Sequence, residues 1–255
     1  MDIQFGKTAK DYAVHRKGFP DLFFENLFQS QIVKVGDKIL DIGTGTGTIA
    51  RGLAKRGCSV IGVDPAIELL QEAKILAETE NCKPTFVEGT AENTAMESDQ
   101  FDLVIAGQCW HWFDGVGASL ESKRVLKPNG LVIIAHFDWL PLSGNVVSAT
   151  EELIEQFNPK WSMGGGTGIY PKWPRHIGEA GFVDIQTNSY DINVIYTPEA
   201  WRGRIRASAG VAASLSGDQV EKFDQQLTAM LASEFPDEEL IIPHRIFVVT
   251  GRKSQ

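Results

Sequence analysis

The sequence predicts an α/β fold in which a parallel sheet is covered by helices on both faces. Through residue 137, short apolar runs alternate with segments of helical periodicity, which is the pattern of repeated strand–helix–strand units. The runs are rich in β-branched residues and carry few polar positions, as expected for strands buried on both sides. A glycine-rich turn follows the first of them, so the crossover helices should begin beside a candidate binding site.

Composition and charge limit the class of protein. The chain has 255 residues, 43% of them hydrophobic and 22% charged, which excludes disorder and a fibrous repeat. The formal net charge of −9 makes a phosphate backbone or an anionic lipid surface a poor partner. We therefore expect no nucleic-acid partner and no membrane association, while the sequence leaves the oligomeric state open.

Cysteine and histidine usage argues against a metal site or a disulfide framework. The three cysteines, Cys58, Cys82 and Cys109, form no CxxC pair, and the five histidines form no HExxH motif. The first residues are polar and mixed in charge, and no apolar run approaches the roughly 18 residues that a membrane helix needs. These features predict a reduced, cytoplasmic protein without a bound metal.

The core elements follow from hydrophobic spacing. After Pro20, apolar residues at helical spacing predict a helix within an N-terminal helical cover formed by residues 1–36. Strands are expected at 38–42, 58–64, 84–89, 101–107 and 131–137, and helices at 48–56, 66–77 and 116–126. The sequence Lys-Pro-Asn-Gly at 127–130 predicts a turn before the fifth strand.

The alternation breaks after Phe137. Further elements are expected as a helix at 145–157, a loop at 161–174, a short helix before Gly181, a strand at 182–192, helices at 198–208 and 217–233, and a last strand at 244–251. We interpret the chain as a single domain over residues 1–255. Its cofactor-binding core is 37–137, and helical insertions at 138–181 and 197–238 form a substrate cover.

The glycine-rich turn reads Asp41-Ile42-Gly43-Thr44-Gly45-Thr46-Gly47 and joins a strand to a helix. Glycines there allow a tight turn and let a ligand approach bare backbone. Position 48 is threonine, so the dinucleotide pattern GxGxxG is absent, and no GKS or GKT supports a phosphate loop. Asp41 at the strand end would repel a pyrophosphate but suits a ligand that carries an ammonium group.

Further polar residues follow the next two strands. Asp64 closes the second strand 21 residues after Gly43, where a carboxylate accepts hydrogen bonds from ribose hydroxyls. The segment Thr90-Ala91-Glu92 follows the third strand, where a loop can hydrogen-bond an adenine edge.

Residues 37–137 resemble the class I S-adenosylmethionine-dependent methyltransferases, of the type 11 or UbiE-like kind. The motifs LDIGTGTG, GVD, VEGTAE, FDLVIAGQCWHWF and VLKPNG occur in the family's order, and the HWFD stretch resembles the trans-aconitate methyltransferase branch. The resemblance implies a Rossmann-like, doubly wound, seven-stranded sheet whose last strand, here HRIFVVTG, is antiparallel. It also implies S-adenosylmethionine as cofactor, S-adenosylhomocysteine as product, and direct in-line transfer to an oxygen or carbon of a small-molecule acceptor.

The resemblance also implies a set of cofactor-binding residues, with Asp41 at the methionine ammonium and Asp64 at the ribose. They are Tyr12, Arg16, Asp41, Gly43, Thr44, Gly45, Gly47, Asp64, Pro65, Thr90, Ala91, Glu92, Gly107 and Gln108. Two alternatives remain open at this point. The chain could be a nicotinamide-dependent oxidoreductase, or a protein that binds S-adenosylmethionine without turnover.

The segment after the fourth strand should lie beside the transferred methyl group. His111 is a candidate general base because an imidazole titrates near neutrality, although it could simply line the cofactor or pack beneath Trp112. Cys109 has no partner in the sequence and is interpreted as a small buried residue. The Asn/Asp-Pro-Pro-Tyr/Phe motif of amino-group methylators is absent here, which argues against methylation of DNA bases.

Aromatic and basic residues suggest where an acceptor binds. All six tryptophans lie beyond residue 109, and four are substrate candidates unless they form a subsidiary core: Trp110, Trp112, Trp139 and Trp173. Arg202 could clamp a carboxylate, although a solvated helix face above a Trp/Ile contact is the favoured interpretation. The glycines at 164–166 predict that residues 138–175 form a mobile cover of the substrate site.

Overall fold

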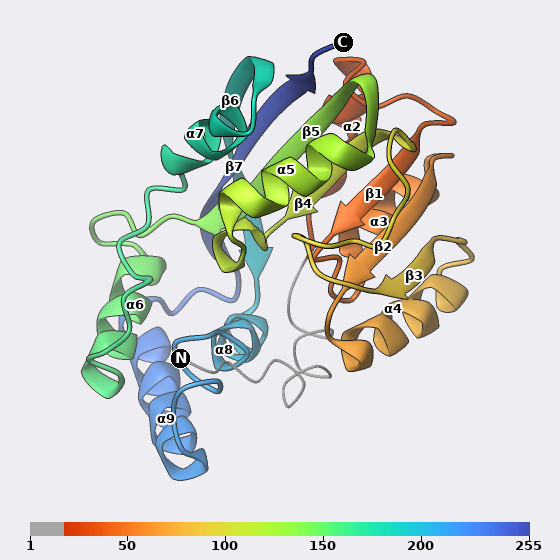
Figure 1. Cartoon of the computed structure of the whole chain (residues 1–255). Helices are drawn as coiled ribbons and strands as arrows, with labels where there is room; N and C mark the ends of the chain where they lie inside the picture. Colours follow the sequence, from red (N-terminus) through yellow and green to blue (C-terminus); the bar gives the residue numbers. More distant parts are fainter. Residues whose placement is uncertain (1–17) are drawn as a thin grey trace. The chain divides into compact units, whose positions relative to one another are not determined.

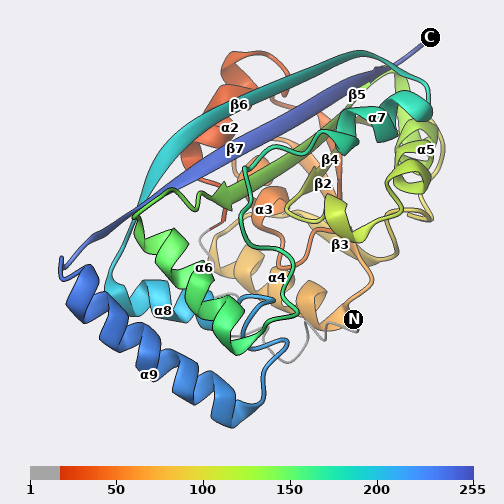
Figure 2. The ribbon, with the colours of Figure 1, turned by 90° about the vertical axis from the view of Figure 1, so that its left-hand side faces the viewer.

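The computed structural model describes residues 18–255, and they form a seven-stranded sheet (Figure 1). The strand order is β3-β2-β1-β4-β5-β7-β6. The strands are β1 (Lys38–Ile42), β2 (Ser59–Asp64), β3 (Thr85–Glu88), β4 (Phe101–Gly107), β5 (Leu126–Trp139), β6 (Phe182–Tyr196) and β7 (Leu240–Lys253). The first five pair in parallel, and β7 runs against β5, as the arrows in Figure 2 show. The expected doubly wound fold with an antiparallel last strand is confirmed.

Helices occur where the apolar spacing predicted them, with ends that differ by a few residues. They are α2 (Asp21–Gln29), α3 (Thr48–Ala54), α4 (Ile67–Thr79), α5 (Gly115–Val125), α6 (Val146–Phe157), α7 (Lys172–Glu179), α8 (Pro198–Arg206) and α9 (Gly217–Glu234). A single 3-10 turn, η2 (Trp110–Trp112), follows β4. Within residues 18–255, no helix is both long enough and apolar enough to cross a membrane.

The described residues group into two compact units. Unit 2 consists of residues 18–137, 170–189 and 246–255, and it contains β1 to β4 with α2 to α5 and α7. Of the described residues, unit 1 contains 138–169 and 190–245. The single-domain interpretation of the whole chain stays a prediction.

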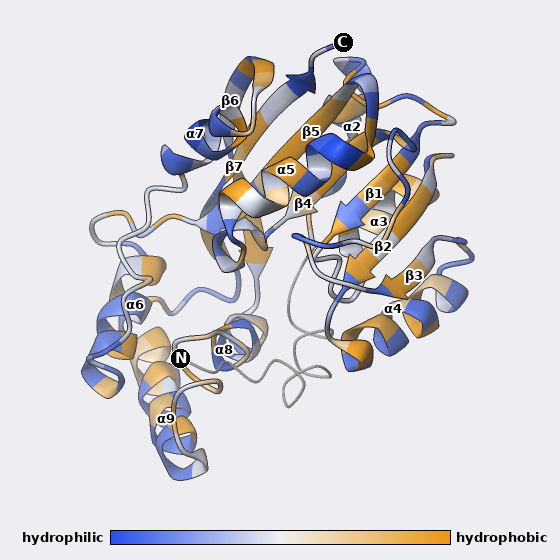
Figure 3. Cartoon of the chain, viewed as in Figure 1, coloured by the Kyte–Doolittle hydropathy of each residue, from blue (hydrophilic) through white to orange (hydrophobic). Residues whose placement is uncertain are grey.

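The core of unit 2 lies on the central strands. Leu40, Val104 and Val132 are fully buried at neighbouring positions of β1, β4 and β5, because parallel strands in mid-sheet have helices on both faces. Figure 3 shows these strands as mainly apolar and the helices as apolar on one side only. This packing fixes the carboxyl ends of β1, β2 and β4, where the sequence placed the candidate site.

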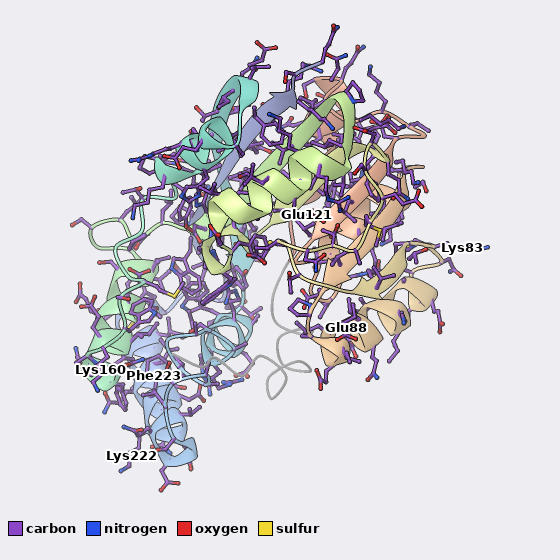
Figure 4. All side chains as sticks on the ribbon, viewed as in Figure 1. Lys83, Glu88, Glu121, Lys160, Lys222 and Phe223 are labelled. Atoms are coloured by element: carbon purple, nitrogen blue, oxygen red, sulfur yellow. The ribbon has the colours of Figure 1, made fainter. Side chains whose placement is uncertain are left out.

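Unit 1 has a separate core built from α6, α8 and α9. Trp201, Phe223 and Leu227 are its fully buried centre, as the apolar stripe on residues 217–233 predicted for α9. That helix begins at Ser216 with a capping box, in which Ser216 and Gln219 satisfy each other's backbone groups. Figure 4 shows Phe223 at this core, with Lys222 beside it on α9.

Two local predictions were wrong. The turn expected at 127–130 lies inside β5, which already begins at Leu126. Asn129 takes a positive φ of 64°, and the pairing of β4 with β5 is irregular between Phe101 and Leu103, so the bend is absorbed as a strand irregularity. The loop expected to reach residue 174 ends earlier, because α7 begins at Lys172 after Pro171.

Candidate functional site

The glycine-rich turn lies between β1 and α3, at the carboxyl end of the sheet. Gly43, Gly45 and Gly47 have φ values of 66°, 55° and 78°, a region that residues with a Cβ adopt only under strain. The backbone N–H of Gly47 donates to the carbonyl of Thr44 at 2.8 Å, which closes the turn before α3. All three glycines are therefore required by the backbone conformation itself.

The three glycines differ in what surrounds them. A Cβ at Gly43 would lie 2.7 Å from Phe113 Cζ and 2.8 Å from Cys109 Sγ, and one at Gly47 would lie 2.7 Å from Phe86 Cζ. A Cβ at Gly45 would meet no described atom within 4 Å. Gly43 and Gly47 are thus needed for packing inside the protein, whereas Gly45 leaves open space where a ligand can approach the backbone.

Asp41 stabilises the turn through two hydrogen bonds. Its Oδ2 accepts a hydrogen bond from Thr44 Oγ1 at 2.6 Å and one from the backbone N–H of Ala50 at 3.1 Å, so it braces the turn against the start of α3. The side chain is buried, and burial raises its pKa to about 7 in spite of these hydrogen bonds. A nearby cation such as an ammonium group would favour its charged form.

Asp64 links the turn to the end of β2. Its Oδ2 accepts from the N–H of Gly45 at 2.9 Å and its Oδ1 from the N–H of Ala66 at 2.9 Å, and burial raises its pKa. Each carboxylate oxygen has a second lone pair, so the side chain keeps capacity for two more donors. In the parallel register, Asp64 pairs with Glu88, the exposed last residue of β3, which is labelled in Figure 4. Pro65, the next residue after Asp64 in the chain, is also exposed.

The loop after β3 is tied to the start of α5. Glu92 Oε1 accepts the backbone N–H of Asp114 at 3.0 Å, and Asp114 caps α5 through Val116 N–H. Thr90 is exposed and exchanges backbone hydrogen bonds with Asn93, whereas Ala91 is buried. The loop is therefore held in one conformation, with Thr90 at its surface.

Glu121, labelled on α5 in Figure 4, anchors the next part of this loop. Burial acts to raise its pKa, but hydrogen bonds from Arg124 and from the hydroxyl and N–H of Thr94 outweigh burial and lower the pKa to about 2. The sequence gave no sign of this role, because Glu121 is one of several charged residues on a helix. It fixes the loop through a charge that persists at any pH near neutrality.

The end of β4 provides a second close backbone approach. A Cβ at Gly107 would lie 2.0 Å from Ile49 Cδ1, so this glycine is required by packing against α3. Gln108 has a φ of 63°, and its Nε2 donates to the carbonyl of Phe137 at 2.6 Å. A strained, half-buried residue at a strand end is typical of functional sites.

His111 lies in η2 beside a second histidine that sequence reasoning missed. The exposed His111 ring lies edge-on to the buried ring of His136, with centroids 5.3 Å apart, and tilts against Trp112 at 4.5 Å. Tyr170 and Trp173 stack in parallel at 4.1 Å and flank His136. No sequence signal pointed to His136, because it occupies an ordinary position in an apolar strand.

The structure separates the four tryptophans that were substrate candidates. Trp110 and Trp173 are buried in unit 2, where Trp110 Nε1 donates to His176 Nδ1 at 3.2 Å, while Trp112 is 45% exposed. Trp139 belongs to unit 1, where it is half-buried, contacts Trp201 edge-on at 5.4 Å and donates to Glu151 at 2.7 Å. The buried pair forms part of a core, as the alternative interpretation allowed.

Arg202 is already paired inside unit 1. Its Nε donates to Asp224 at 3.1 Å and its Nη1 to Glu199 at 2.8 Å. The role of Arg202 as a carboxylate clamp therefore stays a prediction, and these ion pairs make it less favourable.

Two further predictions have little or no direct support here. Tyr12 and Arg16 lie outside the described residues. In the expected cover, Gly165 N–H donates to buried Glu151 at 2.8 Å and the carbonyl of Thr167 accepts from Arg245 at 3.0 Å, so the glycine segment is anchored at two points.

Among residues 18–255, no group of three or more metal-ligating side chains could hold a metal ion.

Comparison with known proteins identifies the core. A family model described as a methyltransferase domain matches residues 40–134, which include the glycine turn and the strands around it. An uncharacterised methyltransferase of Mycobacterium bovis is 32% identical over 131 residues, which are 51% of this chain and 50% of that protein. The chain thus spans about half the length of the first curated relatives that it matches.

Two other relatives match over longer stretches. An uncharacterised methyltransferase of Schizosaccharomyces pombe is 27% identical over 233 residues, covering 89% of this chain and 88% of that protein. A ubiquinone biosynthesis O-methyltransferase of Bartonella tribocorum is 30% identical over 171 residues, covering 64% of this chain and 66% of that protein.

Solved structures share the fold. A protein of Anaeromyxobacter dehalogenans, provisionally described as a type II methyltransferase, superposes with a TM-score of 0.67 at 21% identity and covers 94% of this chain and 98% of that one. A Haemonchus contortus phosphoethanolamine N-methyltransferase, solved with phosphomonomethylethanolamine and S-adenosylhomocysteine, gives a TM-score of 0.58 at 22% identity and covers 98% of this chain and 58% of that one. At such identities the likeness shows the fold alone.

Proposed function

We propose that the chain is a class I S-adenosylmethionine-dependent methyltransferase that transfers a methyl group to an oxygen or carbon of a small-molecule acceptor. Transfer is by direct in-line displacement. The observation that carries this proposal is the open backbone at Gly45, whose N–H donates to Asp64 and whose neighbour Thr44 donates to Asp41.

The residues of the turn suit this cofactor. Gly45 leaves space beside the backbone, and Asp64 fixes the Gly45 N–H while retaining lone pairs for the two ribose hydroxyls. Asp41, whose charged form is disfavoured by burial, gains a favourable partner in an ammonium group. A dinucleotide would instead bring a pyrophosphate to these two carboxylates, which disfavours the oxidoreductase alternative.

The chain's own residues would act mainly by binding and orientation. The bound cofactor supplies an activated methyl group on a sulfonium, so correct positioning of the acceptor provides much of the acceleration. Exposed His111, next to His136, is placed to accept a proton from an acceptor hydroxyl or acidic carbon. Apolar Trp112 and Phe113 beside it would help to exclude water.

The acceptor class is a further part of the proposal. The relative named for ubiquinone biosynthesis is an O-methyltransferase, which supports an oxygen acceptor. The excess of acidic residues and the absence of the amino-group methylation motif support a small molecule over a nucleic acid. We also propose that the protein acts in the cytoplasm, because its three cysteines, all among residues 18–255, form no disulfide framework.

Isothermal titration with S-adenosylhomocysteine and with NAD tests the proposal. We expect saturable binding of S-adenosylhomocysteine and no heat with NAD, and the reverse result would establish the oxidoreductase alternative. An assay for transfer of a labelled methyl group from S-adenosylmethionine to each of a panel of phenols and organic acids then distinguishes an enzyme from a protein that only binds the cofactor. Cofactor binding without transfer to any member of a broad panel would favour the non-catalytic alternative.

A further inference from the structure

Helix α8 in unit 1 carries three arginines at alternate positions, and one of them differs from the others. Arg202 and Arg206 both donate to Asp224 of α9 and to Glu199. Residues two apart on a helix point in nearly opposite directions, so Arg204 cannot join this network. Within residues 18–255, the Arg204 side chain forms no ion pair and no hydrogen bond, whereas the other three arginines of unit 1 in this range are all paired.

Arg204 lies against an aromatic wall. Its guanidinium carbon is 4.7 Å from the centroid of the Trp139 ring, in a cation–π arrangement. Trp139 packs edge-on against fully buried Trp201, which Tyr196 also contacts at 5.5 Å. The guanidinium is therefore held in place by stacking while its donor edge remains without a partner.

The charge balance around Arg204 favours an added anion. Burial lowers the pKa of Arg204, which means that the cation is poorly solvated, and Asp138 and Tyr196 offset this only through space. A guanidinium removed from water is stabilised best by a carboxylate or phosphate that meets its fork. An indole face stacked with a guanidinium offers such a ligand an apolar contact and a bidentate partner together.

One buried acid, Glu151, contacts the N–H edge of the same indole. Glu151 accepts from Trp139 Nε1 at 2.7 Å and from the N–H of Gly165 at 2.8 Å. Burial raises its pKa, so its neutral form is favoured and its repulsion of an anion is reduced. Glu151 is thus committed to the glycine segment and does not neutralise Arg204, with which it forms no ion pair.

We propose that Arg204, stacked on Trp139, is an oxyanion-binding residue of unit 1 whose ligand carries a carboxylate or a phosphate group. The inference does not depend on the proposed function, because the binding site lies within unit 1 and can be measured alone. It assigns to Arg204 the carboxylate recognition that the sequence suggested for Arg202.

Titration of the full-length protein with small probes at constant ionic strength tests the proposal. Benzoate and inorganic phosphate are the anionic probes, and benzamide is the neutral control of the same shape as benzoate. We expect one or both anions to bind in the millimolar range and benzamide not to bind. Binding of benzoate alone would indicate a carboxylate ligand, and binding of phosphate alone a phosphorylated ligand. Either result supports an oxyanion site.

Three variants on one helix give the matched comparison. Arg204→Gln should weaken binding of the anion by about tenfold or more, whereas Arg206→Gln, from the opposite face, should change it by less than about twofold. Arg204→Lys keeps the charge and loses the fork, so it should fall between them. Thermal melts confirm that each variant is folded.

Several outcomes would overturn the proposal. It is wrong if neither anion binds the native protein, if benzamide binds as tightly as benzoate, or if Arg204→Gln binds the anion unchanged. It is also wrong if Arg202→Gln, and not Arg204→Gln, abolishes binding. S-adenosylhomocysteine should bind the Arg204→Gln variant and the native protein with the same affinity. If the native protein did not bind S-adenosylhomocysteine at all, the proposed function would be refuted independently of the anion site.

Discussion

The glycine turn of unit 2 and the arginine helix of unit 1 place charged groups in opposite ways. In and beside the turn, Asp41 and Asp64 each accept hydrogen bonds from nearby backbone N–H groups, so their positions follow from the strand ends. On α8, the partner of an arginine depends on which way its helix position faces, and Arg202 and Arg204 meet different surroundings. A site whose geometry is set by the backbone can be predicted from a sequence motif. A site that depends on the direction in which a helix residue faces can be predicted only when the packing of that helix is known.

The largest effect should come from replacing glycines of the turn, and it should differ between neighbours. Gly45→Val adds a side chain into open space, so it should remove measurable binding of S-adenosylhomocysteine and cost about 1–3 kcal/mol of stability from its φ of 55°. Gly43→Val also collides with Phe113 and Cys109 and should cost several kcal/mol more. Calorimetry and denaturant melts measure both.

If both variants lost the same stability, the distinction between a packing glycine and a ligand-facing glycine would fail. Normal cofactor binding by Gly45→Val would show that the turn does not receive the ligand. A conservative control is Gly36→Ala, because Gly36 has a similar positive φ of 92° and lies in open space away from the turn. It should report the cost of backbone strain alone.

The next effect is at Asp64. Asp64→Ala should weaken binding of S-adenosylhomocysteine by more than about tenfold, because charge-assisted hydrogen bonds are worth roughly 1.5–3 kcal/mol each. The same variant frees the N–H groups of Gly45 and Ala66, so part of the loss reflects a looser turn. Asp64→Asn retains one oxygen acceptor and should lose less. Unchanged affinity in both variants would exclude the ribose assignment.

A smaller effect, on stability, is expected at Asp41. Its pKa is raised to about 7 by burial, so the folded state favours the protonated form, and the stability this contributes is lost as pH rises from about 4 through about 7. Asp41→Asn keeps an acceptor for Thr44 and Ala50 without the buried charge. We expect its stability relative to the native protein to increase by about 1–3 kcal/mol between pH 4 and pH 8.

Melts at several pH values check this expectation. A constant difference between the two proteins across this range would mean that Asp41 is ionised throughout, and that burial does not control its pKa. Asp102 provides a contrast, because its hydrogen bonds from Lys127 and Lys38 N–H outweigh burial and lower its pKa. Asp102→Asn should therefore lose stability relative to the native protein as pH rises through the acidic range to about 4, and the difference should stay constant above that pH.

The sequence predicted most of unit 2 because its elements are short and strongly patterned. The strands at 38–42 and 101–107 and the turn at 41–47 were placed correctly, since apolar runs and glycines leave few alternatives. The turn at 127–130 was misplaced, because a Pro-Asn-Gly sequence fits a strand irregularity as well as a turn. Motif reading also could not distinguish Gly43 from Gly45, which differ only in their neighbours.

The candidate site was predicted less completely. His136 and Glu121 lie at ordinary strand and helix positions, and their contacts with Tyr170 and Thr94 come from chain segments more than 20 residues away. Arg202 was chosen from a basic cluster in which the sequence cannot say which arginine has a carboxylate partner. Long-range packing decides these cases, and a single sequence does not record it.

The smallest expected effect concerns the glycine segment of unit 1. Residues 161–170 should exchange amide hydrogens quickly without ligand, because exposed Gly165 and Gly166 have open surroundings, and more slowly when cofactor and acceptor are bound. Glu151→Gln keeps an acceptor for Gly165 N–H and should leave the pattern unchanged, whereas Glu151→Ala should raise the exchange rate. Equal protection with and without ligands would make this segment a fixed wall.

A crystal structure of the protein with S-adenosylhomocysteine tests the central claim most directly. The account predicts the ligand against the backbone of Gly45, with its ribose hydroxyls hydrogen-bonded to Asp64 and its ammonium group beside Asp41. Gly43 and Gly47 should remain packed against Cys109 and Phe86 without touching the ligand. A ligand bound elsewhere, or one that leaves the open side of Gly45 empty, would contradict the assignment of this turn as the cofactor site.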